Sequence, residues 1–131
     1  MNIDYLTVRD VTIIHFMVMK KYGAGEHAGI REQGLLESAV HRPQQSAFGE
    51  DAYPLFNEKA GALFESLARN HCFFNGNKRT AFASLDIFLK KNGVYIMQNT
   101  DENEEFTVAV AEGKVSLSDS VIWLKSHTKK R

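Results

Sequence analysis

Two long stretches with helical periodicity, residues 55–70 and 78–91, follow one another with only a short loop between them. In both, apolar residues recur at the spacing that places them on one face of a helix. These residues are Phe56, Ala60, Leu63, Phe64 and Leu67 in the first stretch, and Ala81, Phe82, Leu85, Phe88 and Leu89 in the second. Amphipathic helices joined by a short loop pack side by side, so the sequence predicts a helical pair in the core.

Shorter helical patterns surround this pair. The first covers residues 7–22, with Thr7 as a cap and Gly23 as a stop signal. A second contains Leu35, Leu36, Ala39 and Val40 and ends before Pro43. Two more cover residues 103–111 and residues 118–127, the latter with Val121, Ile122 and Leu124 inward and Trp123 as a large packing residue. The chain has 131 residues, 44% of them hydrophobic, which suffices to bury a core. We therefore expect an all-α bundle of about six helices, in one domain spanning residues 1–131.

Three segments lack a helical face. Residues 43–54, bounded by both prolines of the chain, are either a plain surface loop or a flap that contacts a partner. Residues 94–98 could be extended but are too short to build a sheet. Residues 129–131 are expected to form a solvated tail.

Charge and cysteine content narrow the function classes. Sixteen basic and sixteen acidic residues cancel, which argues against a broad surface for nucleic acid or an anionic membrane. The chain contains no apolar run of the roughly 18 residues that a membrane span needs, and no leader pattern at its start. The single cysteine, Cys72, excludes an internal disulfide and a multi-cysteine zinc site. We expect a cytoplasmic protein without direct nucleic-acid or membrane partners.

The loop between the two central helices reads NHCFFNGNKRT, residues 70–80. Lys78 and Arg79 stand in the first turn of the second helix, where the positive end of the helix dipole disfavours cations by roughly 0.3–1 kcal/mol each. A bound anion would reverse that cost, because the backbone N–H groups of residues 75–77 and both cations could surround it. Gly76 suits such a loop, since glycine permits positive φ and close approach of a ligand.

Each residue of this loop also has a plain structural explanation. His71 could stabilise the end of the first helix, Phe73 is expected to be a core anchor, and Asn77 is a common N-cap. Lys78 and Arg79 could point into water. Their combination within one short segment favours a phosphate pocket faced by a histidine. The other histidines, His15, His27, His41 and His127, show no spacing that indicates chemistry.

Residues 71–79, HCFFNGNKR, resemble the H-x-F-x-[DN]-[AG]-N-K-R motif of the Doc (death-on-curing) toxins, a branch of the Fic/Doc family. The resemblance extends to GIREQGLLESAVHRPQ before the motif and TAFASLDIFLKKNG after it. It implies a Fic/Doc-like helical fold with a short flap loop. Fic proteins that transfer AMP carry a proline, a glycine and an arginine where this chain has Cys72, Lys78 and Phe82.

The resemblance implies a toxin of a toxin–antitoxin system. Doc toxins present the γ-phosphate of ATP, so the implied activity is a protein kinase acting on a Ser or Thr of a cytosolic protein. The target in the family's characterised toxins is translation elongation factor Tu, and its modification blocks translation. Two alternatives stay open, namely AMP transfer to protein and a weakly active module that binds an antitoxin.

The family's site roles carry over by position. His71 would be the general base, and an imidazole titrates close to neutral pH, which suits that task. Lys78, Arg79 and the backbone at Gly76 would hold the triphosphate of ATP. Phe73 would anchor the motif.

The two asparagines of the motif would serve the loop and the metal. Asn77 would brace the loop or touch a phosphate. Asn75 stands where many relatives have an acidic residue associated with Mg²⁺, and its amide oxygen can coordinate the ion without adding charge. The implied cofactors are ATP and Mg²⁺.

Regulation and target docking are also implied by the resemblance. The expected partner is a cognate antitoxin, Phd-like or similar, whose C-terminal segment would lie in an apolar groove of the bundle. The flap that aligns the target would correspond to residues 44–53.

Overall fold

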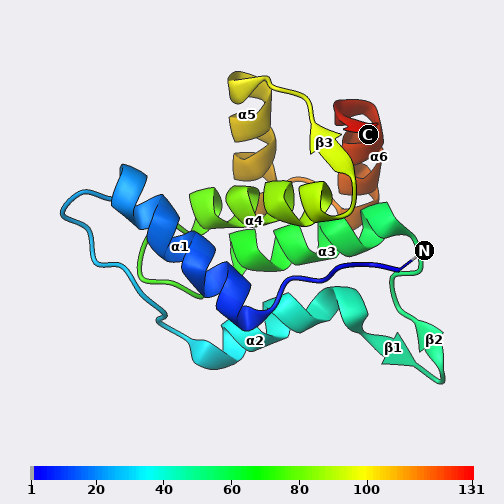
Figure 1. Cartoon of the computed structure of the whole chain (residues 1–131), viewed down its shortest axis with the longest axis horizontal. Helices are drawn as coiled ribbons and strands as arrows, with labels where there is room; N and C mark the ends of the chain where they lie inside the picture. The colour runs from blue at the N-terminus through cyan, green and yellow to red at the C-terminus, as the bar shows by residue number, and fades with distance from the viewer. Residues whose placement is uncertain (1) are drawn as a thin grey trace.

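The computed structural model describes residues 2–131 and is built mainly from helices (Figure 1). The helices are α1 (Val8–Tyr22), α2 (Gln33–His41), the 3₁₀ turn η1 (Arg42–Gln44), α3 (Phe56–Arg69), α4 (Asn77–Lys91), α5 (Thr100–Ala111) and α6 (Leu117–His127). The strands are β1 (Ser46–Ala47), β2 (Glu50–Asp51), β3 (Val94–Ile96) and β4 (Thr128–Lys130). The prediction of an all-α bundle of about six helices is confirmed.

The helices α3 and α4 form the predicted central pair. They run in opposite directions, with α1 and α2 on one side and α5 and α6 on the other (Figure 1). Helix α3 is buried around most of its circumference, as expected of a core helix. A Cβ added at Gly61 would lie 2.9 Å from Leu117 Cδ1, so the glycine permits the close approach of α6. Within residues 2–131, no helix has the length and hydrophobicity that crossing a membrane requires.

Side-chain caps define where several helices begin. Thr7 caps α1 in a reciprocal box with Asp10, as the sequence predicted for this end. Asn99 caps α5 by accepting a hydrogen bond from the N–H of Glu102, at 3.1 Å. The helix therefore begins at residue 100 rather than at the expected residue 103. Gly93, at φ 78°, adopts the left-handed conformation that is common just after the end of a helix.

The expectation that residues 94–98 are too short to build a sheet is wrong. Residues 129–131, expected to form a solvated tail, have exposed side chains, but residues 129 and 130 belong to a paired strand. Strand β3 pairs with β4 in an antiparallel ribbon, with Val94 opposite Lys130 and Ile96 opposite Thr128. The side chains of Val94 and Ile96 are buried, whereas those of Lys129 and Lys130 are exposed. The lysines looked like a solvated tail because the pairing involves backbone groups distant in sequence.

Helix α6 buries a narrower face than its apolar residues indicated. Leu124 is 1% exposed, but Ile122 is 67% exposed, so its predicted inward position is wrong. Trp123 packs as expected, since its ring stacks on Phe106 at 3.9 Å and on His127 at 4.0 Å between centroids.

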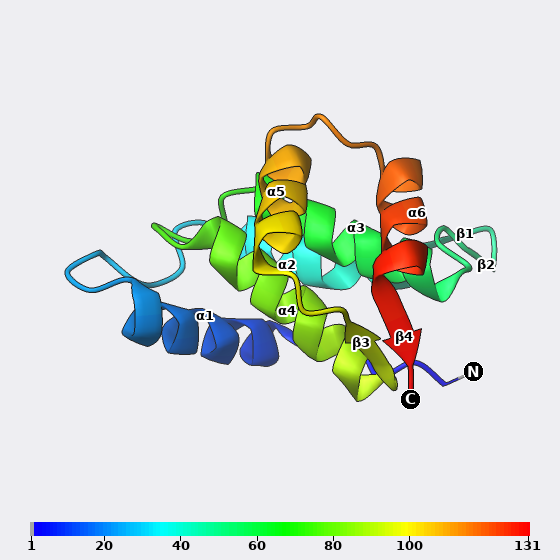
Figure 2. The ribbon, with the colours of Figure 1, turned by 90° about the horizontal axis from the view of Figure 1, so that it is seen from above.

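Residues 43–54, expected to be a surface loop or a flap, include the end of the turn η1 and a small hairpin. Strands β1 and β2 pair antiparallel, and the turn between them exposes Phe48 fully. Lys59 Nζ lies 3.3 Å from Asp51 Oδ2 and ties the hairpin to the start of α3. The hairpin lies at one end of α3 and the motif loop begins at the other end, as Figures 1 and 2 show. The 14 residues of α3 span about 21 Å at 1.5 Å per residue, and His71 follows the second end. A target touching both the hairpin and His71 must therefore span about six extended residues.

Candidate active site

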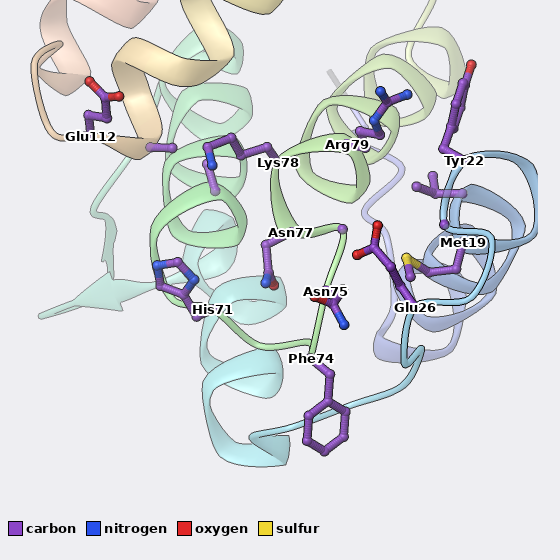
Figure 3. Close-up of a pocket in the computed structure, with 15 residues that line it drawn as sticks. Met19, Tyr22, Glu26, His71, Phe74, Asn75, Asn77, Lys78, Arg79 and Glu112 are labelled. Carbon is purple, nitrogen blue, oxygen red and sulfur yellow. The ribbon is translucent and has the colours of Figure 1, made fainter.

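A hollow of about 560 Å³ opens where α1 and α3 end and α4 begins (Figure 3). Its size falls within the roughly 300–1,000 Å³ of small-molecule sites. The lining includes His71 and the motif residues from Asn75 to Arg79. The structure thus brings the motif histidine and both motif cations to one pocket.

Helix α4 starts at this pocket without a side-chain cap. Its N-cap is Gly76, in the left-handed conformation at φ 72°. A Cβ at this position would lie 2.6 Å from Met19 Sδ, so a bare backbone lets α1 pack close to the loop. The N–H groups of the first turn of α4 have no capping side chain and are therefore available to an anion.

The two cations extend to opposite sides of the pocket. Lys78 extends toward the side where His71 and Glu112 lie, and Arg79 extends toward Tyr22 (Figure 3). The Arg79 guanidinium stands 4.2 Å from the centre of the Tyr22 ring, a cation–π contact that orients it. Over residues 2–131, neither cation forms an ion pair within 4.0 Å, so their charge remains available to a ligand.

Two carboxylates, of Glu26 and Glu112, line the same pocket. The pKa of Glu112 lies below its usual value, first because Lys114 donates a hydrogen bond to it and also because the charges of Lys114 and Lys78 lie nearby. Neither carboxylate belongs to the motif, so the sequence does not indicate that they line this pocket. They balance part of the positive charge that the motif places here.

Asn77 braces the motif loop against itself. Its Oδ1 accepts from the N–H of Phe73 and its Nδ2 donates to the carbonyl of Phe73, both at 3.0 Å. The Phe73 ring is 2% exposed and stacks on the ring of His15, with centroids 3.9 Å apart. Both polar groups of the Asn77 amide are thus engaged by the loop backbone.

The oxygen donors at the pocket fit a magnesium ion that is held mainly by phosphates. Asn75 Nδ2 donates to the carbonyl of His27 at 2.9 Å, which leaves Oδ1 as the amide atom free to bind a cation. Glu26 adds a carboxylate to the same lining. Mg²⁺ commonly takes one or two protein oxygens and completes its shell with water and phosphate. Across the described chain, no cluster of three His, Cys, Asp or Glu side chains could hold a metal by itself.

Two residues that the sequence reasoning did not assign contact the motif loop from outside. His15 is fully buried and lies 3.1 Å from Thr80 Oγ1 through its Nδ1. Arg31 donates to the carbonyl of His71. His15 follows Val11 by four positions and precedes Val18 by three, so its place on the apolar face of α1 could have been read from the sequence.

Cys72 lies inside the motif loop, next to the histidine. Its side chain is fully buried, and burial raises the pKa of its thiol to about 11. The thiol is therefore protonated and unreactive at neutral pH in the folded protein.

The sequence of this chain matches a known family over most of the residues that line the pocket. Residues 5–89 match the sequence model of the Fic/DOC family, a stretch that includes α1, α3, the motif loop and most of α4. The chain belongs to the Fic/Doc family. The Fic/Doc match includes every motif residue from His71 to Arg79.

Two similar proteins place the chain in the Doc branch of the Fic/Doc family. Toxin Doc of Mycolicibacterium smegmatis is 49% identical over 77 residues, which cover 59% of this chain and 59% of that protein. Protein kinase doc of Escherichia phage P1 is 31% identical over 114 residues, which cover 87% of each. The predicted resemblance to Doc is confirmed.

Proposed function

We propose that this chain is a Doc-type toxin that transfers the γ-phosphate of ATP to a Ser or Thr hydroxyl of a cytosolic protein. The observation that carries the proposal is the pocket that His71 shares with Lys78, Arg79 and the uncapped start of α4. A nucleotide triphosphate is a polyanion, and these groups supply positive charge and N–H donors at one place. The name of the phage P1 relative, a protein kinase, agrees with this chemistry.

The pocket residues divide the work of a phosphoryl transfer. His71 takes the proton of the target hydroxyl, whose oxygen forms a bond to the γ-phosphorus. The bond from that phosphorus to the bridging oxygen breaks, and ADP leaves with the electron pair. Lys78 and Arg79 stabilise the charge on the phosphate oxygens during transfer, together with the N–H groups of the first turn of α4.

Asn75 and Glu26 are the residues that would hold Mg²⁺ with the nucleotide. When bound, the ion would neutralise phosphate charge. Asn75 Oδ1 is free for this role because the other half of its amide is tied to His27.

The test is to determine whether the α or the γ phosphorus of ATP becomes attached to protein. The pure protein is incubated with a bacterial extract and ATP labelled at the α or at the γ phosphorus, and labelled protein is separated on a gel. We expect γ label on protein and no α label. Label from the α position would replace the proposal with AMP transfer, and no label from either would favour a binding module without catalysis.

Elongation factor Tu is the first target to try, because the resemblance to Doc implies it. Purified elongation factor Tu replaces the extract in the same assay, and mass spectrometry locates the modified Ser or Thr. Label that appears in extract but not on purified elongation factor Tu would keep the kinase activity and exclude this target.

Changing Asn75 to aspartate is expected to strengthen magnesium binding. A carboxylate adds a charge where the amide has none, and a gain of about 1.4 kcal/mol lowers the half-saturating Mg²⁺ concentration about tenfold. The variant loses the hydrogen bond to His27, so we expect about 1 kcal/mol lower stability. Calorimetric titration of Mg²⁺ into protein with ATP measures the affinity.

Asn57→Asp is the matched control, because it adds the same charge in the first turn of α3, at the far end from the pocket. It is expected to leave the magnesium titration unchanged. Equal titration curves for Asn75→Asp and the parent chain would exclude residue 75 from the metal site.

The antitoxin is proposed to bind a second hollow, of about 480 Å³, between α1, α4 and α5. Its lining includes the apolar residues Val18, Phe82 and Val108. The hollow also shares Lys78 and Arg79 with the first pocket. A segment of antitoxin seated there would contact both cations and compete with a nucleotide.

A further inference from the structure

His71 has a backbone conformation that a histidine rarely adopts. Its φ is 51°, in the left-handed region, and Phe48 is the other non-glycine residue with positive φ among residues 2–131. Such a conformation costs a non-glycine residue about 1–2 kcal/mol. His71 directly follows Asn70, the C-cap of α3, at the position where helices usually carry glycine.

This left-handed residue redirects the chain from α3 into the motif loop. It sets the direction in which the imidazole leaves the backbone, and that direction is into the pocket. Strain of this kind persists where surrounding contacts hold it in place. A contact that fixes the His71 peptide therefore also fixes the imidazole.

Arg31 makes that contact from the segment before α2. Its Nε and Nη2 both donate to the carbonyl oxygen of His71, at 3.2 Å and 2.9 Å. The backbone N–H groups of Arg31 and Glu32 donate to the carbonyl of Cys72, at 2.8 Å and 3.1 Å. Two successive carbonyls of the motif loop are thus bound to one short stretch of chain.

The Arg31 side chain is outside the pocket lining, so a ligand in the pocket would not touch it. Its nearest carboxylate, of Glu32, is 3.9 Å away and both side chains are about half exposed, which makes that ion pair weak. The contact that best accounts for its placement is the one with His71.

We propose that Arg31 is a positioning residue that keeps His71 in the left-handed conformation and so keeps its imidazole in the pocket. The proposal deepens, and rests on, the proposed phosphoryl transfer, for which His71 is the base. A charged guanidinium with two donors on one oxygen is suited to this role, whereas a lysine ammonium would lack the planar fork.

The test compares Arg31→Ala and Arg31→Lys with Arg69→Ala. Arg69 is a matched control because it lies in the last turn of α3, outside the pocket lining, with a side-chain exposure of 43% against 44% for Arg31. We expect Arg31→Ala to lower kcat by about 10²-fold, the cost of a base displaced by about 1 Å. Its Kd for ATP should change less than about twofold, because the phosphate-binding groups are untouched. Arg31→Lys should be intermediate, and Arg69→Ala should retain the kcat of the parent chain.

Two further readouts separate positioning from general stability. Backbone chemical shifts of His71 report its φ, and in Arg31→Ala they should leave the left-handed range while α3 and α4 keep theirs. Added methylguanidinium should restore part of the lost kcat. If Arg31→Ala does not fold, the same measurements on Arg31→Lys decide.

A normal kcat in the Arg31 variants, or a His71 that stays left-handed in them, would overturn the role of Arg31. If the parent chain transfers no label at all, the proposed kinase function fails instead. The chemical shifts of His71 still decide the structural role of Arg31 in that case.

Discussion

Replacing His71 by alanine is expected to abolish measurable transfer of the γ label, with a fall of about 10²–10⁴-fold in kcat. The reason is that the pocket lining offers no other imidazole to take the proton of the target hydroxyl. Binding of ATP should persist, because Lys78, Arg79 and the start of α4 remain. Calorimetry with ATP and the labelling assay together measure both properties.

The control for this variant is His41→Ala. His41 is exposed in the last turn of α2 and lies outside the pocket lining, so its loss should leave transfer unchanged. Undiminished labelling by His71→Ala would remove His71 from the role of base. Loss of ATP binding in the same variant would instead mean that the imidazole serves mainly to hold the nucleotide.

Replacing His15 by alanine is expected to lower the free energy of unfolding by about 3 kcal/mol. His15 Nε2 accepts from the N–H of Gly29 at 3.0 Å, so Nδ1 carries the proton and donates to Thr80 Oγ1. Truncation leaves both partners without their bonds and opens a cavity beside the Phe73 ring. Urea unfolding measures the loss, and Met17→Ala, on the exposed face of α1, should cost far less.

The same histidine should make stability depend on pH. Burial lowers the pKa of His15 below its ordinary value of 6.5, because the charged form is poorly solvated in the core. The unfolded chain therefore binds this proton at a higher pH than the folded chain does. The stabilising contribution is complete above about pH 6.5 and declines as the pH falls toward the lower folded pKa.

His15→Gln removes the titrating group and keeps a polar side chain. Unfolding free energies of the variant and the parent chain should therefore converge as the pH falls from 7.5 toward 5. Parallel curves across that range would show that His15 does not titrate differently in the folded and unfolded states.

The helices could be predicted because their signals are local. The apolar spacing of α3 and α4 and the cap at Thr7 depend on neighbours within a few positions. The β3–β4 ribbon could not, since it joins backbone groups from two ends of the C-terminal third of the chain. Ile122 was misplaced because periodicity shows which residues share a face but not how much of that face a neighbour covers.

The motif residues were likewise visible as one short segment, whereas the groups that hold it were not. His15 and Thr80 are 65 positions apart, and Arg31 is 40 positions before His71. These contacts arise because the stretch before α2 runs beside the motif loop, with Ile30 bridged to Phe73. Motif spacing identifies the groups suited to the chemistry, but the fold determines which distant residues orient them.

Cys72 gives this fold an internal reporter. Its thiol is fully buried, so a thiol reagent can reach it only when the motif loop detaches from its contacts. The rate of modification in native buffer therefore measures how often that detachment occurs, without any label being introduced. The modification rates with added nucleotide, with added antitoxin and in a variant at position 31 can then be compared directly with one another.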